Sequence, residues 1–99
     1  MLKAAFIFVA SGADGSKHRA VVQTPSVELT AIGVADYKEA VSVAAALAEE
    51  GIGAIELCGG FGTEGVAAVK KAVAGKAAVG VVRFDIHPGL GGKSGDDFF

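Results

Sequence analysis

The chain has 99 residues, which is enough for one domain with a modest core. Its formal net charge is −2 and its nine Lys and Arg residues are scattered, which argues against nucleic acid or an anionic membrane surface as the main partner. It has one cysteine, no signal-peptide pattern and no apolar run of the ~18 residues that a membrane span needs, so we expect a cytoplasmic protein that does not enter a membrane.

The first third of the sequence predicts two strands separated by a short helix. Residues 3–10 (KAAFIFVA) are apolar after the first residue and rich in Phe, which favours a strand buried on both faces. A loop containing Ser11 follows. Residues 16–23 are expected to form a short helix that ends before a Thr-Pro pair, because the residue before proline avoids the α region. Residues 27–34 (VELTAIGV) alternate in their first half, which predicts a strand with one wetter face.

The rest of the sequence predicts two helices that alternate with two more strands. A D-x-x-E capping box begins at Asp36, and apolar residues then recur every three or four positions until Gly51 ends the helix. Residues 53–58 form a short apolar run that is typical of a buried strand. A second helix is expected over residues 63–75, and residues 77–84 (AAVGVVRF) predict the last strand.

The expected element order is βαβαβαβ followed by a tail, which indicates an α/β fold with a parallel four-stranded sheet. We favour a flavodoxin-like three-layer arrangement with strand order 2-1-3-4, and the alternative is a half-barrel that closes only with a partner. One α/β domain is expected over residues 1–87. A Gly-rich tail over residues 88–99 is expected to pack on this domain or on a neighbouring subunit.

One carboxylate, Glu56, interrupts the apolar run of the third strand. A buried carboxylate without a partner is costly, so we expect Glu56 to be buried and bonded to Arg83, near the end of the last strand, or to loop N–H groups. The structural interpretation of this pair is an ion pair inside the fold. The functional interpretation is that Glu56 acts as a general acid or base, and the two interpretations are compatible.

A thiol and a glycine-rich loop follow this carboxylate. Cys58 precedes a predicted helix start, a position that activates a thiol, so a nucleophilic role competes with the commoner role of a small core residue. We expect the N–H groups of the loop, together with Ser11 and Arg83, to bind an anion, because the positive end of the helix faces the same crevice. The loop residues in this prediction are Gly59, Gly60, Gly62 and Thr63.

A second polar cluster follows the last strand. Asp85 and His87 lie two residues apart, a spacing that allows them to orient one another for proton transfer or to hold a metal. No second histidine stands nearby in the sequence, and we expect neither a metal nor a cofactor. The segment HPGLGGKS that begins at His87 lacks the first glycine of a P-loop and a helix after it, which argues against nucleotide hydrolysis.

Three stretches of the sequence carry a family resemblance: the opening KAAFIFVA, the central ELCGGFG before a helix, and RFDIHPGLGGKSGD near the end. With these stretches the chain resembles a family of short bacterial proteins known only as a domain of unknown function. The resemblance covers nearly the whole length. It implies a small α/β protein, and it implies no activity, substrate or catalytic residue.

Three functions remain open. The first is binding of a small anionic molecule, and the second is a cofactor-independent lyase or isomerase that uses Glu56 or the Asp85–His87 pair. The third is a structural or regulatory subunit of a homo-oligomer. The thin core, the uncovered last strand and the final Phe98-Phe99 pair predict such an oligomer, most simply a two-fold dimer with the tail across its interface.

Overall fold

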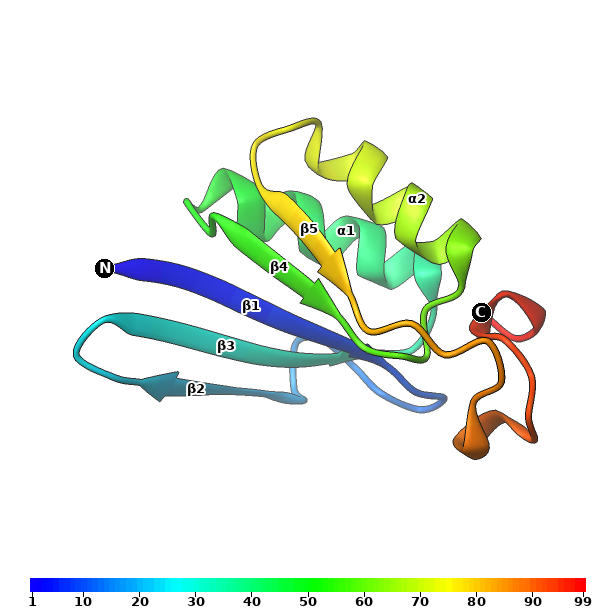
Figure 1. The fold of residues 1–99 in the computed structure, drawn as a ribbon. Coiled ribbons are helices and arrows are strands. Elements are labelled where there is room, and N and C mark those ends of the chain that lie inside the picture. Colours follow the sequence, from blue (N-terminus) through cyan, green and yellow to red (C-terminus); the bar gives the residue numbers. More distant parts are fainter.

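A computed structural model describes all 99 residues of the chain. Five strands and two helices follow one another along the sequence, and two short 3-10 turns, η1 and η2, shape the tail (Figure 1). Neither helix has the length and apolar character that a membrane crossing requires. The elements are β1 Leu2–Val9, β2 Arg19–Gln23, β3 Val27–Val34, α1 Tyr37–Glu49, β4 Ala54–Leu57, α2 Thr63–Val73, β5 Ala78–Val81, η1 Pro88–Leu90 and η2 Gly95–Asp97.

The five strands form one mixed sheet with the order β2-β3-β1-β4-β5. The four strands β3, β1, β4 and β5 run parallel in the flavodoxin-like order predicted from the sequence. The half-barrel alternative is therefore wrong. The prediction of a purely parallel four-stranded sheet is also wrong, because β2 pairs antiparallel with β3 and adds a fifth strand at the edge.

A β-hairpin replaces the short helix predicted over residues 16–23. The Thr24 N–H donates to the Val27 carbonyl at 2.8 Å, and the Thr24 hydroxyl accepts from the Val27 N–H at 2.9 Å. These bonds close a tight Pro-Ser turn between β2 and β3. The β-branched Val21 and Val22 suit a strand better than a helix. No helix therefore joins β1 to β3.

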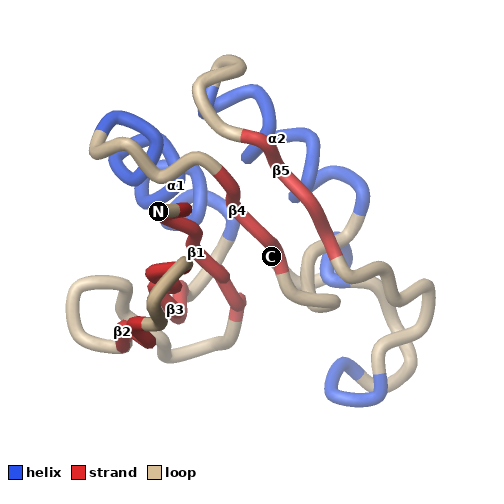
Figure 2. The backbone as a smooth tube through the Cα atoms, turned by 60° about the vertical axis from the view of Figure 1, so that its left-hand side comes forward, coloured by secondary structure: helices blue, strands red, loops and turns tan.

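Both helices lie on the same face of the sheet, so the molecule has two layers rather than the three predicted (Figures 1 and 2). Helices occur only in the β3-to-β4 and β4-to-β5 connections, which step across the sheet in the same direction. Right-handed crossovers in one direction place their helices on one face. The core fills the space between this face and the helices, and its fully buried large residues are Ile7, Ile32, Val34, Ile55, Leu57, Val69 and Val73.

The opposite face of the sheet carries no helix, and we call it the open sheet face. Its side chains alternate along each strand with the core side chains. The register places Phe6 beside Ala31 and Glu56, and Val22 beside Leu29, on this face. Its larger residues are Leu2, Phe6, Phe8, Val22, Val27, Leu29 and Glu56.

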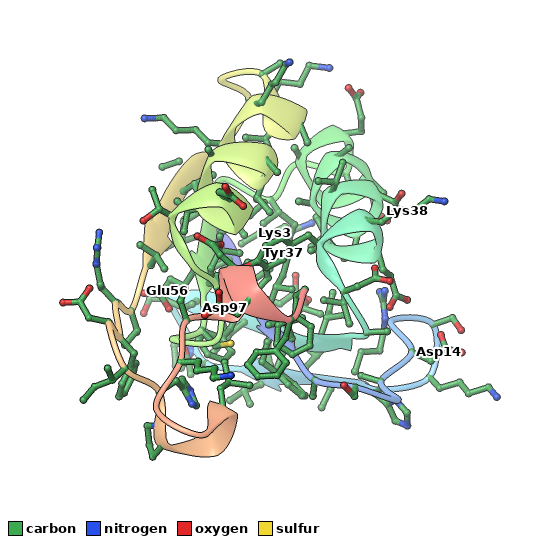
Figure 3. The ribbon with its side chains drawn as sticks, turned by 90° about the vertical axis from the view of Figure 1, so that its right-hand side faces the viewer. Lys3, Asp14, Tyr37, Lys38, Glu56 and Asp97 are labelled. Carbon is green, nitrogen blue, oxygen red and sulfur yellow. The ribbon has the colours of Figure 1, made fainter.

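The tail folds back across the edge of the sheet where the parallel strands end, and η2 packs against the start of α2. Asp36 caps α1 by accepting the Glu39 N–H at 2.8 Å, as the capping box predicts, and so places Tyr37 at the same edge. In the view along this edge, the tail turn lies in front of Tyr37 (Figure 3). Phe99 packs on the core, while Phe98 is largely exposed.

Candidate functional site

A cavity of about 490 Å³ opens between α2 and the segment that follows β5. We call it the α2–β5 pocket. Its volume lies within the range of roughly 300–1,000 Å³ that small-molecule sites occupy. Its lining residues are Phe61, Gly62, Thr63, Val66, Ala67, Lys70, Val81, Arg83, Phe84, Asp85 and Ser94.

The charged residues of the α2–β5 pocket are two cations and one carboxylate. Lys70 comes from α2, and Arg83 and Asp85 follow β5. The Arg83 Nε donates to the Asp85 carboxylate at 2.9 Å, but both side chains are mostly exposed. Water screens such a pair, so it contributes little to stability and leaves Arg83 available. Two cations against one carboxylate give the pocket lining a formal charge of +1.

The tail already occupies the positive end of α2. The Asp96 carboxylate accepts the Glu64 N–H at 3.1 Å and the Gly65 N–H at 3.4 Å. Gly62 is the N-cap residue of α2 and has no side chain to do this. A Cβ at Gly62 would collide with the Asp96 carboxylate, so a glycine is needed there. The sequence pattern predicted a free anion at this helix end, but Asp96 of the same chain fills the place.

Tyr37 links the loop before α2 to the tail. Its hydroxyl accepts the Gly62 N–H at 2.9 Å and donates to the Asp96 carboxylate at 2.8 Å. Its ring stacks on Phe61 with the centroids 5.5 Å apart, and a Cβ at Gly65 would collide with the ring. Burial raises the pKa of Tyr37 above its ordinary value, and the Asp96 charge raises it further, although the Gly62 N–H opposes them. Tyr37 therefore stays protonated and keeps its donor role.

The Asp96 carboxylate is held in its ionised form. Burial opposes ionisation, but the hydrogen bonds from the Glu64 N–H, the Tyr37 hydroxyl and the Gly65 N–H outweigh it, and the Arg83 charge adds to them. The pKa of Asp96 consequently lies below its ordinary value. This carboxylate, absent from the sequence-based candidates, is the group that fixes the tail to α2.

The prediction that Glu56 is buried and bonded to Arg83 is wrong. Glu56 is exposed on the open sheet face, and it makes no side-chain hydrogen bond or ion pair. Arg83 belongs to the pocket on the helix side of the sheet and pairs with Asp85 instead. The short strand alternates, with Ile55 and Leu57 directed to the core and Glu56 directed away from it.

The remaining catalytic candidates do not form a cluster. The half-buried Cys58 accepts the Gly60 N–H at 3.3 Å through its sulfur, a contact that stays within the loop. His87 accepts the Gly89 N–H at 3.0 Å through Nδ1, so it is not oriented by Asp85. Ser11 is exposed in the loop after β1 and does not line the pocket. No three His, Cys, Asp or Glu side chains gather in a way that suits a metal ion.

Two aromatic rings shape the edge of the site beside the loop. The Phe84 ring lies directly on Gly59, where any Cβ would collide with it. The His87 ring packs against Phe84, with the ring centroids 4.9 Å apart. Gly59 thus supports a wall of the α2–β5 pocket rather than a ligand, and the His87 ring helps to position Phe84.

The structure brings four of the predicted site residues into the α2–β5 pocket, namely Gly62, Thr63, Arg83 and Asp85. Glu56, Cys58, His87, Ser11, Gly59 and Gly60 lie outside its lining. Lys70, which also lines the pocket, was not among the sequence-based site candidates. Its spacing of seven residues from Thr63 was the available signal, because residues two helical turns apart share one helix face.

The fold and the pocket define a two-layer α/β domain with a small, net-positive cavity at its strand C-terminal edge. The chain belongs to a family of unknown function (DUF6506), whose model matches residues 2–97, so the resemblance drawn from the sequence is confirmed. No curated protein and no solved structure matches the chain.

Proposed function

We propose that this chain is a binding domain for a compact organic anion with an apolar body, held in the α2–β5 pocket. The observation that carries the proposal is the pairing of two cations, Lys70 and Arg83, with apolar walls in one cavity of ligand size. Small-molecule sites typically combine mostly apolar walls with a few polar groups that fix orientation.

The cationic and apolar residues of the pocket lining favour a ligand with a carboxylate or a phosphate monoester group. The planar guanidinium of Arg83 is suited to two parallel hydrogen bonds to such a group, and Lys70 adds a second positive charge. Hydroxyl groups of Thr63 and Ser94 line the same cavity. Val66, Val81 and Phe84 offer an apolar surface to the rest of the ligand. An inorganic anion alone would leave this surface unused.

The position of Asp96 also limits which groups of the protein can bind the anion. Because the Glu64 and Gly65 N–H groups already bind this carboxylate, the start of α2 supplies little to a second anion. Binding is therefore expected to depend on the side chains of Lys70 and Arg83 rather than on the glycine loop. The sequence-based hypothesis of an anion site thus moves from the loop backbone to the α2–β5 pocket.

Matched small molecules test this proposal. The test is to titrate benzoate and phenyl phosphate into the protein and to record the chemical shifts of its backbone amides. Benzyl alcohol serves as the neutral analogue. We expect the two anions to shift amides of α2 and of residues 81–85, and benzyl alcohol to bind more weakly. Equal binding of benzoate and benzyl alcohol would remove the role of charge and overturn the proposal.

Two neighbouring lysines provide the control. Lys70 lines the pocket, whereas the adjacent Lys71, which is also exposed, does not. Lys70→Ala and Arg83→Gln are expected to weaken benzoate binding by about fivefold to tenfold each, a loss of about 1–1.4 kcal/mol. Lys71→Ala should leave it unchanged. If both lysine variants weaken binding equally, long-range charge and not the pocket is responsible.

The proton-transfer alternative has less support from the geometry. Asp85 lines the pocket, but Glu56 lies on the opposite face of the sheet and His87 is bonded within the tail. A general base must lie within hydrogen-bond reach of its substrate proton. Asp85 is therefore the residue on which any such chemistry would rest, and its ion pair with Arg83 suits ligand positioning equally well.

A further inference from the structure

The open sheet face is an apolar surface that the fold leaves without a covering layer. The strand residues that share it include Leu2, Phe8 and Val22, whose exposed fractions are 49%, 37% and 59%. Phe6 and Leu29 add two half-buried side chains between them. Glu56 is the single charged residue among the strand residues on this face. An apolar surface of this kind marks an interaction site in a folded protein.

We propose that the open sheet face binds the same face of a second copy of this chain, forming a two-fold dimer centred on β1 and β3. A two-fold interface uses one patch twice, so the patch must tolerate contact with itself. This patch does so because it carries almost no charge. Glu56 on β4 lies towards the β5 edge of the sheet, where it remains at the wet rim of the interface.

The size of the face is close to that of the smaller dimer interfaces once the relief of its side chains is included. Strands β1 and β3 have eight residues each, β2 has five, and β4 and β5 have four each. At about 3.3 Å per residue and about 4.8 Å between strands, the sheet projects to roughly 460 Å². Side-chain relief increases the accessible area beyond this flat projection. A standard interface needs roughly 800 Å² per partner, and the smaller stable ones about 600 Å².

Other occupants fit the face less well. The tail, which carries Phe98 and Phe99, is fixed elsewhere by the Asp96 carboxylate and by the contact of Phe99 with Tyr37. The strand residues of the face include no Lys or Arg to attract an anionic lipid surface or an acidic partner. The Phe8 ring lies over Gly33, where a Cβ would come within 2.7 Å of it, so this ring adds to the apolar surface at the centre of the sheet. Apolar sheet faces commonly pack on one another face to face.

Two adjacent valines of β2 give a matched test. Val21 and Val22 have similar exposed fractions, 56% and 59%, but they point to opposite faces of the sheet. Sedimentation equilibrium of the full chain at micromolar concentration should give twice the mass of 9.8 kDa. Val22→Lys should raise the dissociation constant at least about tenfold, and Val21→Lys should change it less than about threefold. Circular dichroism spectra of both variants, compared with the wild type, are the check that they keep their fold.

The outcomes separate the proposal from its alternatives. A wild-type monomer, or a dimer that both variants weaken equally, overturns it. A wild-type monomer that cosediments with neutral phosphatidylcholine vesicles assigns the face to lipid instead. If Val22→Lys fails to fold, nuclear Overhauser contacts between isotope-labelled and unlabelled wild-type copies decide, and contacts from the Phe8 ring are required. The α2–β5 pocket lies on the other side of the sheet, so this test is independent of ligand binding.

Discussion

Replacing Asp96 by Ala removes three hydrogen bonds that join the tail to the rest of the molecule. The carboxylate accepts from the Tyr37 hydroxyl and from the Glu64 and Gly65 N–H groups. Loss of a capping side chain costs about 0.5–2 kcal/mol, and a hydrogen bond to a charged group contributes about 1.5–3 kcal/mol. Water reaches the half-buried carboxylate and screens its charge, so the loss should be smaller than the sum of these contributions. We expect Asp96→Ala to lower the unfolding free energy by about 1–2 kcal/mol.

The neighbouring Asp97 supplies the control for this change. It lies in the same turn and is exposed, and its side chain makes no hydrogen bond. Urea unfolding should therefore place Asp97→Ala within about 0.5 kcal/mol of the wild type. In a domain of this size each 1 kcal/mol moves the melting temperature by about 4–8 °C, so a thermal scan also resolves the two variants. Faster amide exchange at Glu64 and Gly65 should accompany the Asp96 change alone.

The same contact predicts a pH dependence with a definite sign. The pKa of Asp96 is lower in the folded chain than the ordinary value of 3.8. The stabilisation that the ionised carboxylate gives to the folded state is therefore fully present above pH 3.8. The contribution is lost as the pH falls through the folded pKa. The stability difference between wild type and Asp96→Ala should therefore shrink to zero well below pH 3.8. A difference that stays constant there, or equal stability of the Asp96 and Asp97 variants at neutral pH, would refute this reasoning.

Three further substitutions are predicted from local geometry. Gly95→Ala should detach the tail and lower the unfolding free energy by about 1–3 kcal/mol, because the new Cβ would collide with the Gly60 carbonyl oxygen. Limited proteolysis should therefore cut the tail of this variant faster than that of the control Gly80→Ala, whose Cβ meets only open space. Glu56→Ala should change the unfolding free energy of the monomer by less than about 0.5 kcal/mol, and a loss of several kcal/mol would mean that the carboxylate is buried after all. Ala74→Gly should raise the unfolding free energy by about 0.5–1 kcal/mol, and with it the midpoint of urea unfolding, because Ala74 ends α2 with a φ of +52°. No gain would show that the left-handed turn carries no strain.

The sequence predicts the elements whose signals are periodic and local. The capping box at Asp36 and the apolar repeat after it specify α1, and the short apolar runs specify the parallel strands. The segment at 19–23 is too short for its periodicity to separate a helix from a strand. Its β-branched Val21 and Val22, followed by a Pro-Ser turn, were the signals for the hairpin.

The candidate site was harder to predict because its contacts join distant parts of the chain. The placement of Glu56 inside the core followed from the assumption that helices cover both faces of the sheet. With one face open, the alternation of Ile55, Glu56 and Leu57 directs the carboxylate outwards. The link between Tyr37 and Asp96 spans 59 residues and produces no repeating pattern in the sequence.

The dependence of α2 on Asp96 has a consequence for the order of folding. The N-cap residue of α2, Gly62, has no side chain that could cap the helix. The capping carboxylate is that of Asp96, which lies 32 residues after Glu64 in the chain. Asp96 follows every strand and both helices in the chain, so during synthesis this contact should form after them. The start of α2 is therefore expected to fray during synthesis until Asp96 has left the ribosome. Chains that stop before Asp96 should show rapid amide exchange at Glu64 while the sheet is already protected.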